Sequence, residues 1–251
     1  MASKLKGARE VKCVVMQPTF FPWAGYFNLM TQADCFVFLD DVQLEKQSWQ
    51  TRNRIINQGT VSWISVPVLH NSLDQQINQT ETFEQSRWRG KLYRQLQQSY
   101  ARHEYRDDML ALAAGLTETS TTNLAGINIS LILSCCEKMD IMPKNVYRSS
   151  EMDVPDRRTT RLIKLCERLG CDEYLSPRGA SSYLAEDRFC ERSSIKLAFQ
   201  DFSPMPYKQK SSAEFVSHLS IIDLVANIGW AGAAEYVKGC AQPPDQDRKH
   251  D

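Results

Sequence analysis

The chain has 251 residues, of which 42% are hydrophobic and 24% charged, with 30 basic and 30 acidic side chains. This composition is typical of a globular protein and excludes fibrous and disordered classes. Because the formal net charge is zero, no overall field attracts polyanions, and we expect no nucleic-acid or anionic-membrane partner. The apolar runs are short and the N-terminus MASKLKGARE carries no apolar segment, so we expect a cytoplasmic protein without a membrane span.

The first elements predict a βαβ unit. VKCVVM (11–16) is a short β-branched run that ends at a Gln-Pro pair, and CFVFLD (35–40) is a second apolar run. Between them, apolar residues recur at helical spacing from 22 to 33, and a proline suits the first turn of that helix. Two strands joined by a helix of this length are expected to be parallel neighbours in one sheet.

The middle of the chain predicts a hairpin and then helices. Residues 49–69 alternate polar and apolar side chains around an Asn-Gln-Gly turn, as an antiparallel hairpin does. Three helical patterns follow, at 86–100, 104–116 and 123–139.

The βα rhythm then resumes toward the end of the chain. We expect strands at NVYR (145–148), EYLS (173–176) and IKLAFQDF (195–202), a helix at 156–169 that ends at a glycine, and a last helix at 219–229. No repeat and no flexible linker divides the chain. We therefore expect a single α/β domain over residues 1–240, with a mainly parallel Rossmann-like sheet, a β-hairpin arm and a helical insertion, and a disordered tail at 241–251.

Eight cysteines are present, and none of them forms a CxxC pair or a zinc pattern with a nearby histidine. Five of them lie in apolar periodic segments, where a thiol behaves as a small hydrophobic side chain. Cys190 lies in the charged segment RFCER and is the one whose surroundings suggest a reactive thiolate. Structural thiols are the favoured interpretation of the set, which comprises Cys13, Cys35, Cys135, Cys136, Cys166, Cys171, Cys190 and Cys240.

Polar side chains gather where each predicted parallel strand ends. In an open parallel sheet, ligands bind beyond the carboxyl ends of the strands, so these residues are expected to meet at one edge. A single pocket is therefore predicted, lined by Gln17, Asp40, Asp41, Gln43, Arg52, Asn53, Ser176 and Arg178, with Ser149 also at a strand end.

Each of these residues has more than one interpretation. Asp40 and Asp41 suit a turn, and as paired carboxylates they also suit Mg²⁺ beside a phosphate-bearing substrate. Ser149 and Ser150 suit helix capping, although they lie several residues before the helix at 156–169. Arg178, beside Ser176, is either a surface charge or a fork for a phosphate or carboxylate, and we favour the anion.

The hairpin arm carries a second group of binding residues. Trp49, Arg52, Asn53 and Arg54 form an aromatic, guanidinium and amide set that could stack on and hydrogen-bond a sugar or nucleotide. An ordinary amphipathic strand with solvated arginines accounts for the same residues equally well. The histidines lack a visible third partner for a catalytic triad and are expected to be packed or surface residues.

Taken together, these segments resemble the WbqC-like protein family. The resemblance is carried by MQPTFFPWAGYF, ADCFVFLDDVQLEKQSWQTRNRI, WISVPV, YLSPRGASSYL and LSIIDLVANIG, and it spans about residues 13 to 229. Where the family usually has His-Gln-Pro, this chain has Met16 before Gln17. We expect Met16 only to fill space at the strand end and Gln17 to carry the recognition role.

The resemblance implies a role in polysaccharide assembly, notably of O-antigen. It implies a transferase that attaches an aminoacyl group, such as glycyl, to the amino group of a nucleotide-linked amino sugar or glycan precursor. We assign Asp40 or Asp41 as the general base and Arg178 and Arg52 as the residues that hold phosphates. One alternative is a non-catalytic sugar- or nucleotide-binding assembly protein.

The opening stretch MQPTFFPWAGYF also has a fainter similarity, to the entry of nucleotidylyltransferases and pantothenate-synthetase-like ligases. Those enzymes bind ATP phosphates with His-x-Gly-His at the helix start, where this chain has Trp23, Ala24, Gly25 and Tyr26. Gly25 would permit close approach of a ligand, and the helix N-terminus would attract an anion. An ATP-dependent nucleotidylyltransferase or ligase-like enzyme is therefore another alternative, with Mg²⁺ or a nucleotide as candidate cofactor and Trp23, Gly25 and Tyr26 as substrate contacts.

Overall fold

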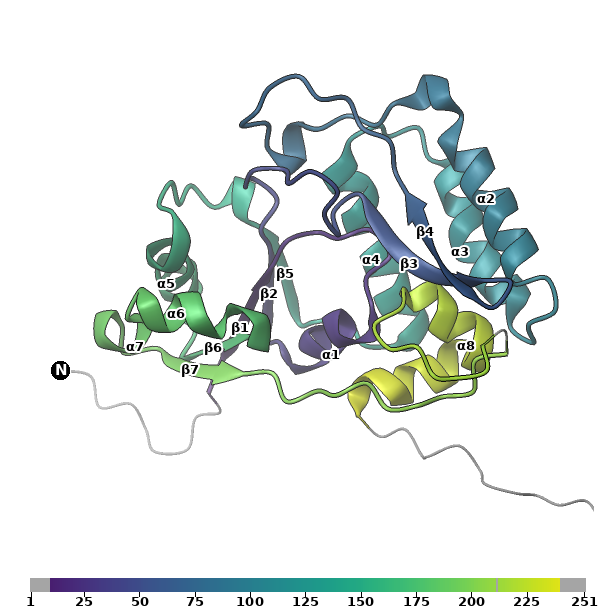
Figure 1. Ribbon diagram of the computed structural model, residues 1–251. Helices are drawn as coiled ribbons and strands as arrows, with labels where there is room; N and C mark the ends of the chain where they lie inside the picture. Colours follow the sequence, from purple (N-terminus) through teal and green to yellow (C-terminus); the bar gives the residue numbers. More distant parts are fainter. Residues whose placement is uncertain (1–9, 211, 240–251) are drawn as a thin grey trace, which may run out of the picture. The chain divides into compact units, whose positions relative to one another are not determined.

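The computed structural model describes residues 10–210 and 212–239, and it has the expected α/β architecture (Figure 1). The predicted tail at 241–251 lies outside these residues. Contacts group the chain into two compact units whose segments alternate along the sequence. Unit 1 comprises Gln32–Leu39, Pro143–Asp201 and the described part of Met1–Met16; unit 2 comprises Gln17–Thr31, Asp40–Met142 and the described part of Phe202–Asp251. This division does not test the single domain expected over residues 1–240, which remains a prediction.

Unit 1 is built on a five-stranded sheet in which every neighbouring pair is parallel. The strand order is β5-β2-β1-β6-β7, with β1 at Lys12–Met16, β2 at Cys35–Phe38, β5 at Asn145–Arg148, β6 at Glu173–Ser176 and β7 at Lys196–Phe199. The predicted parallel pairing of the first two strands is confirmed, in a register that sets Cys13 beside Cys35. Both strands read as continuous apolar runs because a parallel sheet buries both of its faces.

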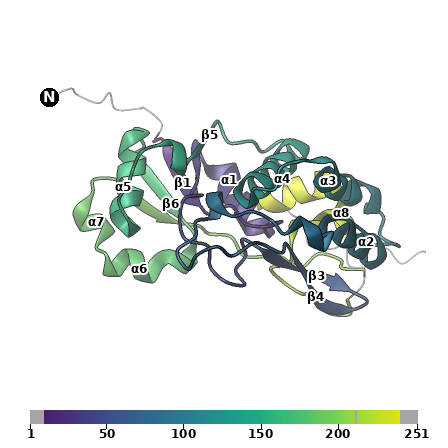
Figure 2. The ribbon, with the colours of Figure 1, turned by 90° about the horizontal axis from the view of Figure 1, so that it is seen from above.

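Helices of unit 1 cover one face of this sheet. α5 (Arg158–Arg168), α6 (Ser181–Glu186) and α7 (Phe189–Arg192) lie together beside the strands in both views (Figures 1 and 2). Alternate residues of β1 and β2, Cys13, Val15 and Val37 among them, share a core cluster with Leu165 of α5 and Phe189 of α7. The period of two along each strand and of 3.6 along α5 brings these apolar side chains to one interface. Two 3₁₀ turns, Ser149–Glu151 and Arg178–Ala180, follow β5 and β6.

Unit 2 contains the hairpin, which forms a separate two-stranded sheet. β3 (Arg52–Asn57) pairs antiparallel with β4 (Thr60–Ser65), as the alternating sequence predicts. Gln58 and Gly59 both adopt positive φ, 50° and 82°, which is the conformation of a tight primed turn. Such a turn matches the right-handed twist of the strands that it joins, so the Asn-Gln-Gly signal was interpreted correctly.

The helices of unit 2 follow the predicted order, and all but the last lie close to their predicted ends. They are α1 (Ala24–Gln32, of which Gln32 groups with unit 1), α2 (Trp88–Ser99), α3 (Arg106–Glu118), α4 (Leu124–Met139) and α8 (Ile221–Lys238), with 3₁₀ turns at Ile77–Gln79 and Glu84–Ser86. α3 packs against α2, α4 and α8, and α8 also contacts β3. Within the described ranges, no helix combines the length and apolar character that crossing a bilayer requires.

The last helix is longer than its sequence pattern predicts. The expected end at 229 coincides with Gly229, whose φ of 69° and ψ of 178° interrupt the helix, after which helical structure continues to Lys238. A Cβ at Gly229 would lie 2.7 Å from the ring of Tyr105, so this position combines a left-handed backbone with close ring packing. The glycine therefore marks a kink rather than an end.

A buried carboxylate joins three parts of unit 2. Asp223, 1% exposed in the first turn of α8, accepts hydrogen bonds from the hydroxyls of Tyr100 at 3.0 Å and Tyr207 at 2.7 Å. Gln209 and Asn227 donate amide hydrogens to the same carboxylate. Burial raises the pKa of Asp223 to about 6, while these donors act in the opposite direction.

We predict a pH-dependent stability term from Asp223. Its pKa is higher in the folded chain than the ordinary 3.8, so its favourable contribution is complete below pH 3.8 and is lost as the pH rises through 6. The unfolding free energy of the wild type, measured relative to Asp223→Asn, should therefore rise by up to about 3 kcal/mol between pH 7 and pH 4. Denaturant titrations at each pH measure this difference. The exposed Asp108→Asn is the control, and an equal pH response in both variants would contradict the assignment.

Candidate functional site

The opening stretch after β1 is irregular but largely buried, so its backbone groups need partners inside the protein. Two asparagines supply donors to three of its carbonyls. Asn128 of α4, 0% exposed, donates its amide hydrogens to the carbonyls of Pro18 at 3.1 Å and Gln50 at 2.9 Å. Asn53 of β3 donates to the carbonyls of Phe20 at 3.1 Å and Phe21 at 2.7 Å. The predicted substrate contact Asn53 thus has its amide hydrogens engaged by the chain itself.

Gln17 belongs to a polar chain next to this clamp. Its side-chain oxygen accepts a hydrogen bond of 2.7 Å from the Gln50 amide, whose own oxygen accepts from Ser48 and from the backbone of Glu45. The hydroxyl of Tyr26 donates to the Gln17 carbonyl at 3.1 Å. Tyr26 is itself buried, and burial raises the pKa of its phenol. Gln17 is half-buried and its orientation is fixed, as recognition of a polar ligand requires.

Trp23 explains the neighbouring glycine. A Cβ placed on Gly25 would lie 2.1 Å from the Trp23 indole, so the glycine leaves space for that ring against α1. The space that the sequence reserved for a ligand beside Gly25 is therefore filled by Trp23. The indole also contacts the His218 ring, with centroids 4.3 Å apart and planes tilted by 37°, and the Phe202 ring, with centroids 5.8 Å apart.

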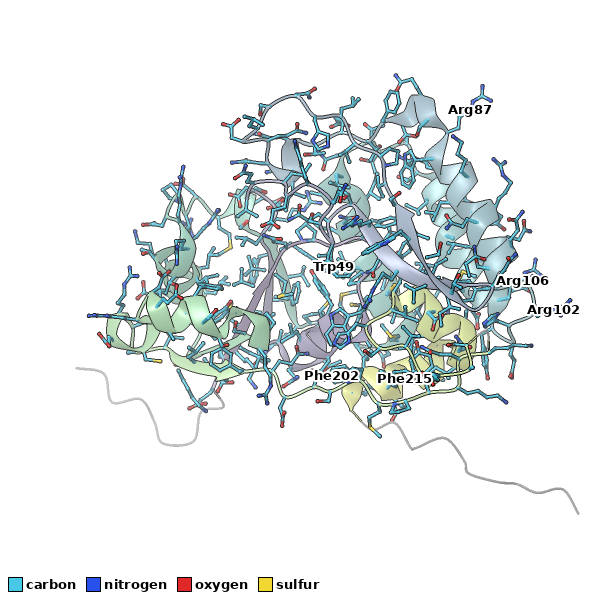
Figure 3. The ribbon with its side chains drawn as sticks, in the orientation of Figure 1. Trp49, Arg87, Arg102, Arg106, Phe202 and Phe215 are labelled. Atoms are coloured by element: carbon cyan, nitrogen blue, oxygen red, sulfur yellow. The ribbon has the colours of Figure 1, made fainter. Side chains whose placement is uncertain are left out.

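The hairpin presents tryptophans and arginines on one face. Trp49 and Trp63 are 48% and 44% exposed, and their ring centroids are 5.7 Å apart. The guanidinium of Arg52 lies 4.2 Å from the Trp63 centroid, and that of Arg54 lies 5.8 Å from the Trp49 centroid. We call these four side chains the aromatic–arginine face; Figure 3 labels Trp49 within it. Half-exposed indoles that carry cationic groups are suited to stacking on flat or sugar rings and to holding phosphates.

Strand geometry produces this face. Arg52 and Arg54 are two residues apart in β3 and point to the same side, and the antiparallel register pairs Arg54 with Trp63. Arg54 also donates to the carbonyls of Ser217 at 3.4 Å and His218 at 3.2 Å. The backbone of His218 is held in a left-handed conformation with φ of 58°. Burial, and then the charge of Arg54, lower the pKa of His218, so its imidazole is neutral at pH 7.

An aromatic pocket lies next to Trp23 in the same unit. Its free volume of about 10 Å³ is comparable to that of one water molecule. Its lining consists of Trp23, Ala24, Pro204, Tyr207, Phe215, His218, Leu219, Leu224 and Tyr236. The pocket is too small to enclose a sugar or nucleotide, so a ligand of that size would lie on the open aromatic–arginine face.

The acidic loop after β2 is hydrogen-bonded to the segment at 73–78. The backbone carbonyl of Asp40 accepts from the Asn78 amide at 2.9 Å, and the Gln43 side chain donates to the Leu73 carbonyl at 2.7 Å. Asp40 is fully buried, whereas Asp41 is partly exposed. Across residues 10–210 and 212–239, no three His, Cys, Asp or Glu side chains are placed to hold a metal ion. Of the two predicted catalytic carboxylates, Asp41 is the more accessible, because it is partly exposed and Asp40 is buried.

The remaining predicted residues lie in unit 1. Ser149 follows β5 and Ser176 ends β6, so both lie at the carboxyl edge of the parallel sheet, and both are buried. Arg178 is exposed and donates to the Gln200 carbonyl at 2.9 Å and to Asp201 at 2.8 Å. The shared pocket predicted for these residues with Gln17, Asp40, Asp41, Gln43, Arg52 and Asn53 spans both units and stays a prediction.

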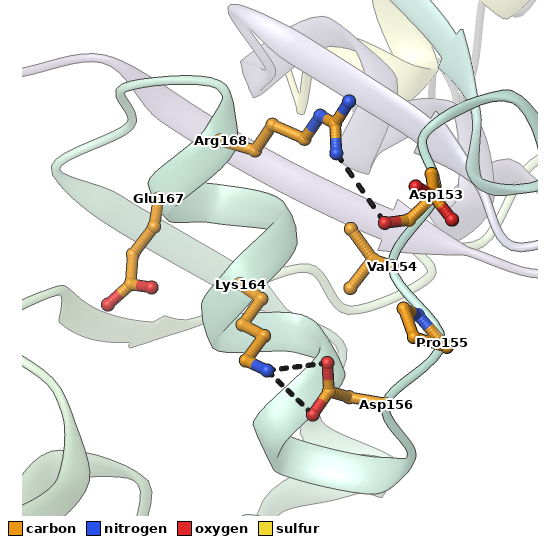
Figure 4. A pocket seen from close by; sticks show the side chains of 7 residues that line it. All are labelled: Asp153, Val154, Pro155, Asp156, Lys164, Glu167 and Arg168. Atoms are coloured by element: carbon orange, nitrogen blue, oxygen red, sulfur yellow. Dashed lines mark hydrogen bonds and ion pairs between the residues drawn. The ribbon is translucent and has the colours of Figure 1, made fainter.

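Unit 1 also contains an open pocket of about 480 Å³ beside α5 (Figure 4). Its walls are charged, and the pair formed by Lys164 and Asp156, 2.7 Å apart, crosses it. Arg168 points to the Asp153 carbonyl at 3.5 Å. The full lining is Asp153, Val154, Pro155, Asp156, Lys164, Glu167 and Arg168, and none of these was a predicted site residue. Exposed pairs of this kind contribute little binding energy, so the pocket is a weaker candidate than the aromatic–arginine face.

Three residues of the candidate site in unit 2 were not selected from the sequence. Trp63 could have been found from the hairpin pattern, because counting back from the Asn-Gln-Gly turn pairs it with Arg54. His218 and Gln50 carry no such local signal. Their roles depend on Trp23 and Gln17, which are distant in sequence.

We predict that Asn128→Leu destabilises the chain. The change removes two donors and leaves the carbonyls of Pro18 and Gln50 buried without them, at about 1–3 kcal/mol for each unsatisfied group. The unfolding free energy from urea titration should fall by roughly 2–5 kcal/mol. Asn71→Leu, at an exposed position, is the matched control and should change it by less than about 0.5 kcal/mol. A loss no larger than that of the control would show that the clamp is not needed.

Comparison with known proteins agrees with the sequence resemblance. The chain is 30% identical to the uncharacterized protein Rv1507c of Mycobacterium tuberculosis over 233 residues, which cover 92% of this chain and 99% of that protein. No solved structure matches significantly. The model of the WbqC-like protein family matches residues 17–235. This chain belongs to the WbqC-like protein family.

Proposed function

We propose that the protein transfers an aminoacyl or acyl group to the amine of a nucleotide-linked amino sugar or glycan precursor in surface polysaccharide biosynthesis. The aromatic–arginine face is the observation that carries this proposal. Its two indoles offer stacking surfaces for a base and a sugar, and its two guanidiniums offer the charge that a diphosphate needs. The face therefore has the chemical character of a nucleotide-sugar site.

Direct aminolysis accounts for the chemistry with few catalytic groups. The neutral amine attacks the acyl carbon, an amide bond forms, and the leaving group departs with the electrons of the broken acyl bond. The ammonium proton passes to a general base, for which the partly exposed Asp41 is better placed to meet substrate than the buried Asp40. His218 is a second candidate, since its imidazole is neutral at pH 7 and exposed.

A non-catalytic binding protein is the competing function. The burial of Asp40 favours it, because a buried carboxylate at a turn has a structural use without any reaction. A third function, an ATP-dependent nucleotidylyltransferase or ligase-like enzyme, is disfavoured by the Trp23 indole, which fills the space beside Gly25 where phosphates would approach.

We expect the transfer reaction to be detectable by mass. The protein is incubated with uridine-diphosphate amino sugars and with acyl thioesters or aminoacyl esters as donors, and the sugar nucleotide is analysed by mass spectrometry. A mass gain equal to the acyl group is the expected result, and it should disappear when the amine is replaced by a hydroxyl. Tight binding without any mass gain would instead support the non-catalytic function.

Binding of the sugar nucleotide should depend on the aromatic–arginine face. Trp63→Ala removes one stacking surface and should weaken binding by about 1–3 kcal/mol in calorimetry, roughly 5- to 150-fold in Kd. The matched control is Leu73→Ala, which removes an 86% exposed apolar side chain outside the face. Equal affinities for the two variants would exclude the face as the binding site.

Substitutions of Gln17 and Met16, at the end of β1, provide a second test of ligand binding. Gln17→Ala should weaken ligand binding by on the order of 1–2 kcal/mol because it leaves a polar partner unpaired, whereas Met16→His should change binding little. Unfolding free energies of both variants are measured in parallel, since Gln17 also accepts a hydrogen bond from Gln50. A larger effect at position 16 would place the chemistry there instead.

A further inference from the structure

An extended segment of unit 2 presents apolar side chains to solvent along one side. β4 and the residues that follow it, 61–69, alternate in burial, because successive side chains of an extended chain point to opposite sides. Ile64 is 0% exposed, whereas Val61, Trp63 and Leu69 are 46%, 44% and 39% exposed. The outward side of this segment therefore carries a row of large apolar side chains.

Phe83 widens this row. Its backbone amide donates to the Pro67 carbonyl at 2.8 Å, next to the antiparallel bridge between Val68 and Thr82. Residues opposite each other in an antiparallel pair project to the same side, so Phe83, which is 40% exposed, lies beside Pro67 on the outward side. We call the resulting set the apolar stripe; it consists of Val61, Trp63, Pro67, Leu69 and Phe83.

The strand at one end of the stripe is uncharged. Among the described residues, β4 has one strand partner, β3, and its sequence TVSWIS contains no Lys, Arg, Asp or Glu. Outer strands usually carry a charged residue or a proline, because an uncharged edge promotes association. Large apolar side chains that gather on such a surface mark a site of interaction.

Positive charge borders the stripe at Trp63. The guanidinium of Arg52 lies 4.2 Å from the Trp63 ring centroid, and Arg54 is paired with Trp63 in the hairpin register. The hydrogen-bond acceptors of these arginines are neutral, namely the Gln47 side chain for Arg52 and two backbone carbonyls for Arg54. Both arginines therefore contribute net positive charge beside the stripe.

α2 adds further basic residues. Its Gln95 side chain donates to the Trp63 carbonyl at 3.2 Å, and Lys91, one turn earlier on the same side of the helix, is exposed. Residues 46–73 and 85–103, which include the hairpin, most of the stripe and α2, contain Lys and Arg but no Asp or Glu. The expectation of no anionic-membrane partner rested on the net charge of the whole chain, which averages this local surface away.

Carboxylates lie near the other end of the stripe. Glu81 is opposite Leu69, whose backbone amide donates to the Glu81 carbonyl at 2.8 Å. Glu84, next to Phe83 in the chain, forms an ion pair of 3.0 Å with Arg89. The positive charge is therefore concentrated at the β4 end of the stripe.

We propose that the apolar stripe and its basic border dock the protein on the surface of an anionic lipid bilayer. The stripe enters the interfacial region, where tryptophan is favoured, while Arg52, Arg54 and Lys91 contact lipid phosphates. Burial of apolar side chains and attraction to anionic lipid act together, since either one alone gives weak binding. The segment lies on the bilayer and does not span it.

Other partners fit this surface less well. Single-stranded nucleic acid would stack on Trp49 and Trp63, but it gains no stacking from Val61 and Leu69. A second copy that paired through the same surface would bring the arginines of both copies together, at a cost in repulsion. A bilayer surface uses the aliphatic side chains, the aromatic side chains and the positive charge at once.

Membrane docking is independent of the proposed transfer reaction, although both use Trp63 and the arginines. Binding is measured by co-sedimentation of the full chain with vesicles of equal parts phosphatidylcholine and phosphatidylglycerol, and with vesicles of phosphatidylcholine alone. The wild type should sediment with the anionic vesicles, much less with the neutral ones, and less as salt is raised. Absence of binding to the anionic vesicles, or equal binding to both kinds, would overturn the proposal.

A matched pair of double variants tests whether the stripe makes the contact. Val61→Asp with Phe83→Asp lies outside the aromatic–arginine face and should lower the partition coefficient by roughly tenfold or more, because it removes two apolar side chains and adds negative charge. Met142→Asp with Met205→Asp makes the same charge change at apolar side chains that are 42% and 37% exposed elsewhere in unit 2. An equal loss in the two double variants would overturn the assignment to the stripe.

Further measurements address folding and the other partners. Circular dichroism checks that each variant is folded, and Val61→Ser with Phe83→Ser replaces the aspartate pair if that pair misfolds. Sedimentation velocity and binding of a single-stranded oligonucleotide are measured for the wild type and for the stripe variant. A dimer that the stripe variant abolishes, or oligonucleotide binding in place of vesicle binding, would overturn the proposal and assign the stripe to that partner.

Discussion

The candidate site in unit 2 depends on one constraint: the buried backbone groups after β1 need hydrogen-bond partners. The stretch from Gln17 to Trp23 has no regular hydrogen-bond ladder, yet most of it is buried, so its carbonyls need donors from elsewhere. Asn128 and Asn53 supply these donors, and Ser220 donates to the Phe21 carbonyl at 2.9 Å. α4, β3 and the start of α8 are thereby fixed to one short segment.

This clamp also orients the groups that face solvent. Asn53 lies between Arg52 and Arg54 in β3, so fixing its amide inward directs both arginines to the opposite side of the strand. The hydrogen bonds of Asn128 and Gln17 to Gln50 hold the residue that follows Trp49. The aromatic–arginine face is therefore supported by buried polar contacts, which gives a binding surface on a hairpin the rigidity that recognition requires.

Unit 1 illustrates a different use of a parallel sheet. Two of its five strands, β5 and β6, have a buried serine at the carboxyl edge, while its interior brings four thiols into one core cluster with α5. A thiol in an apolar core is ordinarily a small hydrophobic side chain, and three of these four carry that signature in the sequence. Within this core, hydrogen bonding from Cys13 lowers the pKa of Cys171, whereas hydrogen bonding to Cys166 raises the pKa of Cys13.

Local signals in the sequence determined the order and type of the elements. Apolar runs such as VKCVVM, helical periodicity and the Asn-Gln-Gly turn act over a few residues, so they predicted the parallel β1–β2 pair, the hairpin and the helices. The sequence also selected Trp49 and the arginines, because their stacking chemistry is intrinsic to the side chain. Tertiary structure alone decided that Asn53 serves the backbone, that Trp23 fills the space beside Gly25 and that the cysteines meet. These outcomes depend on contacts between residues far apart in the chain, which no local pattern encodes.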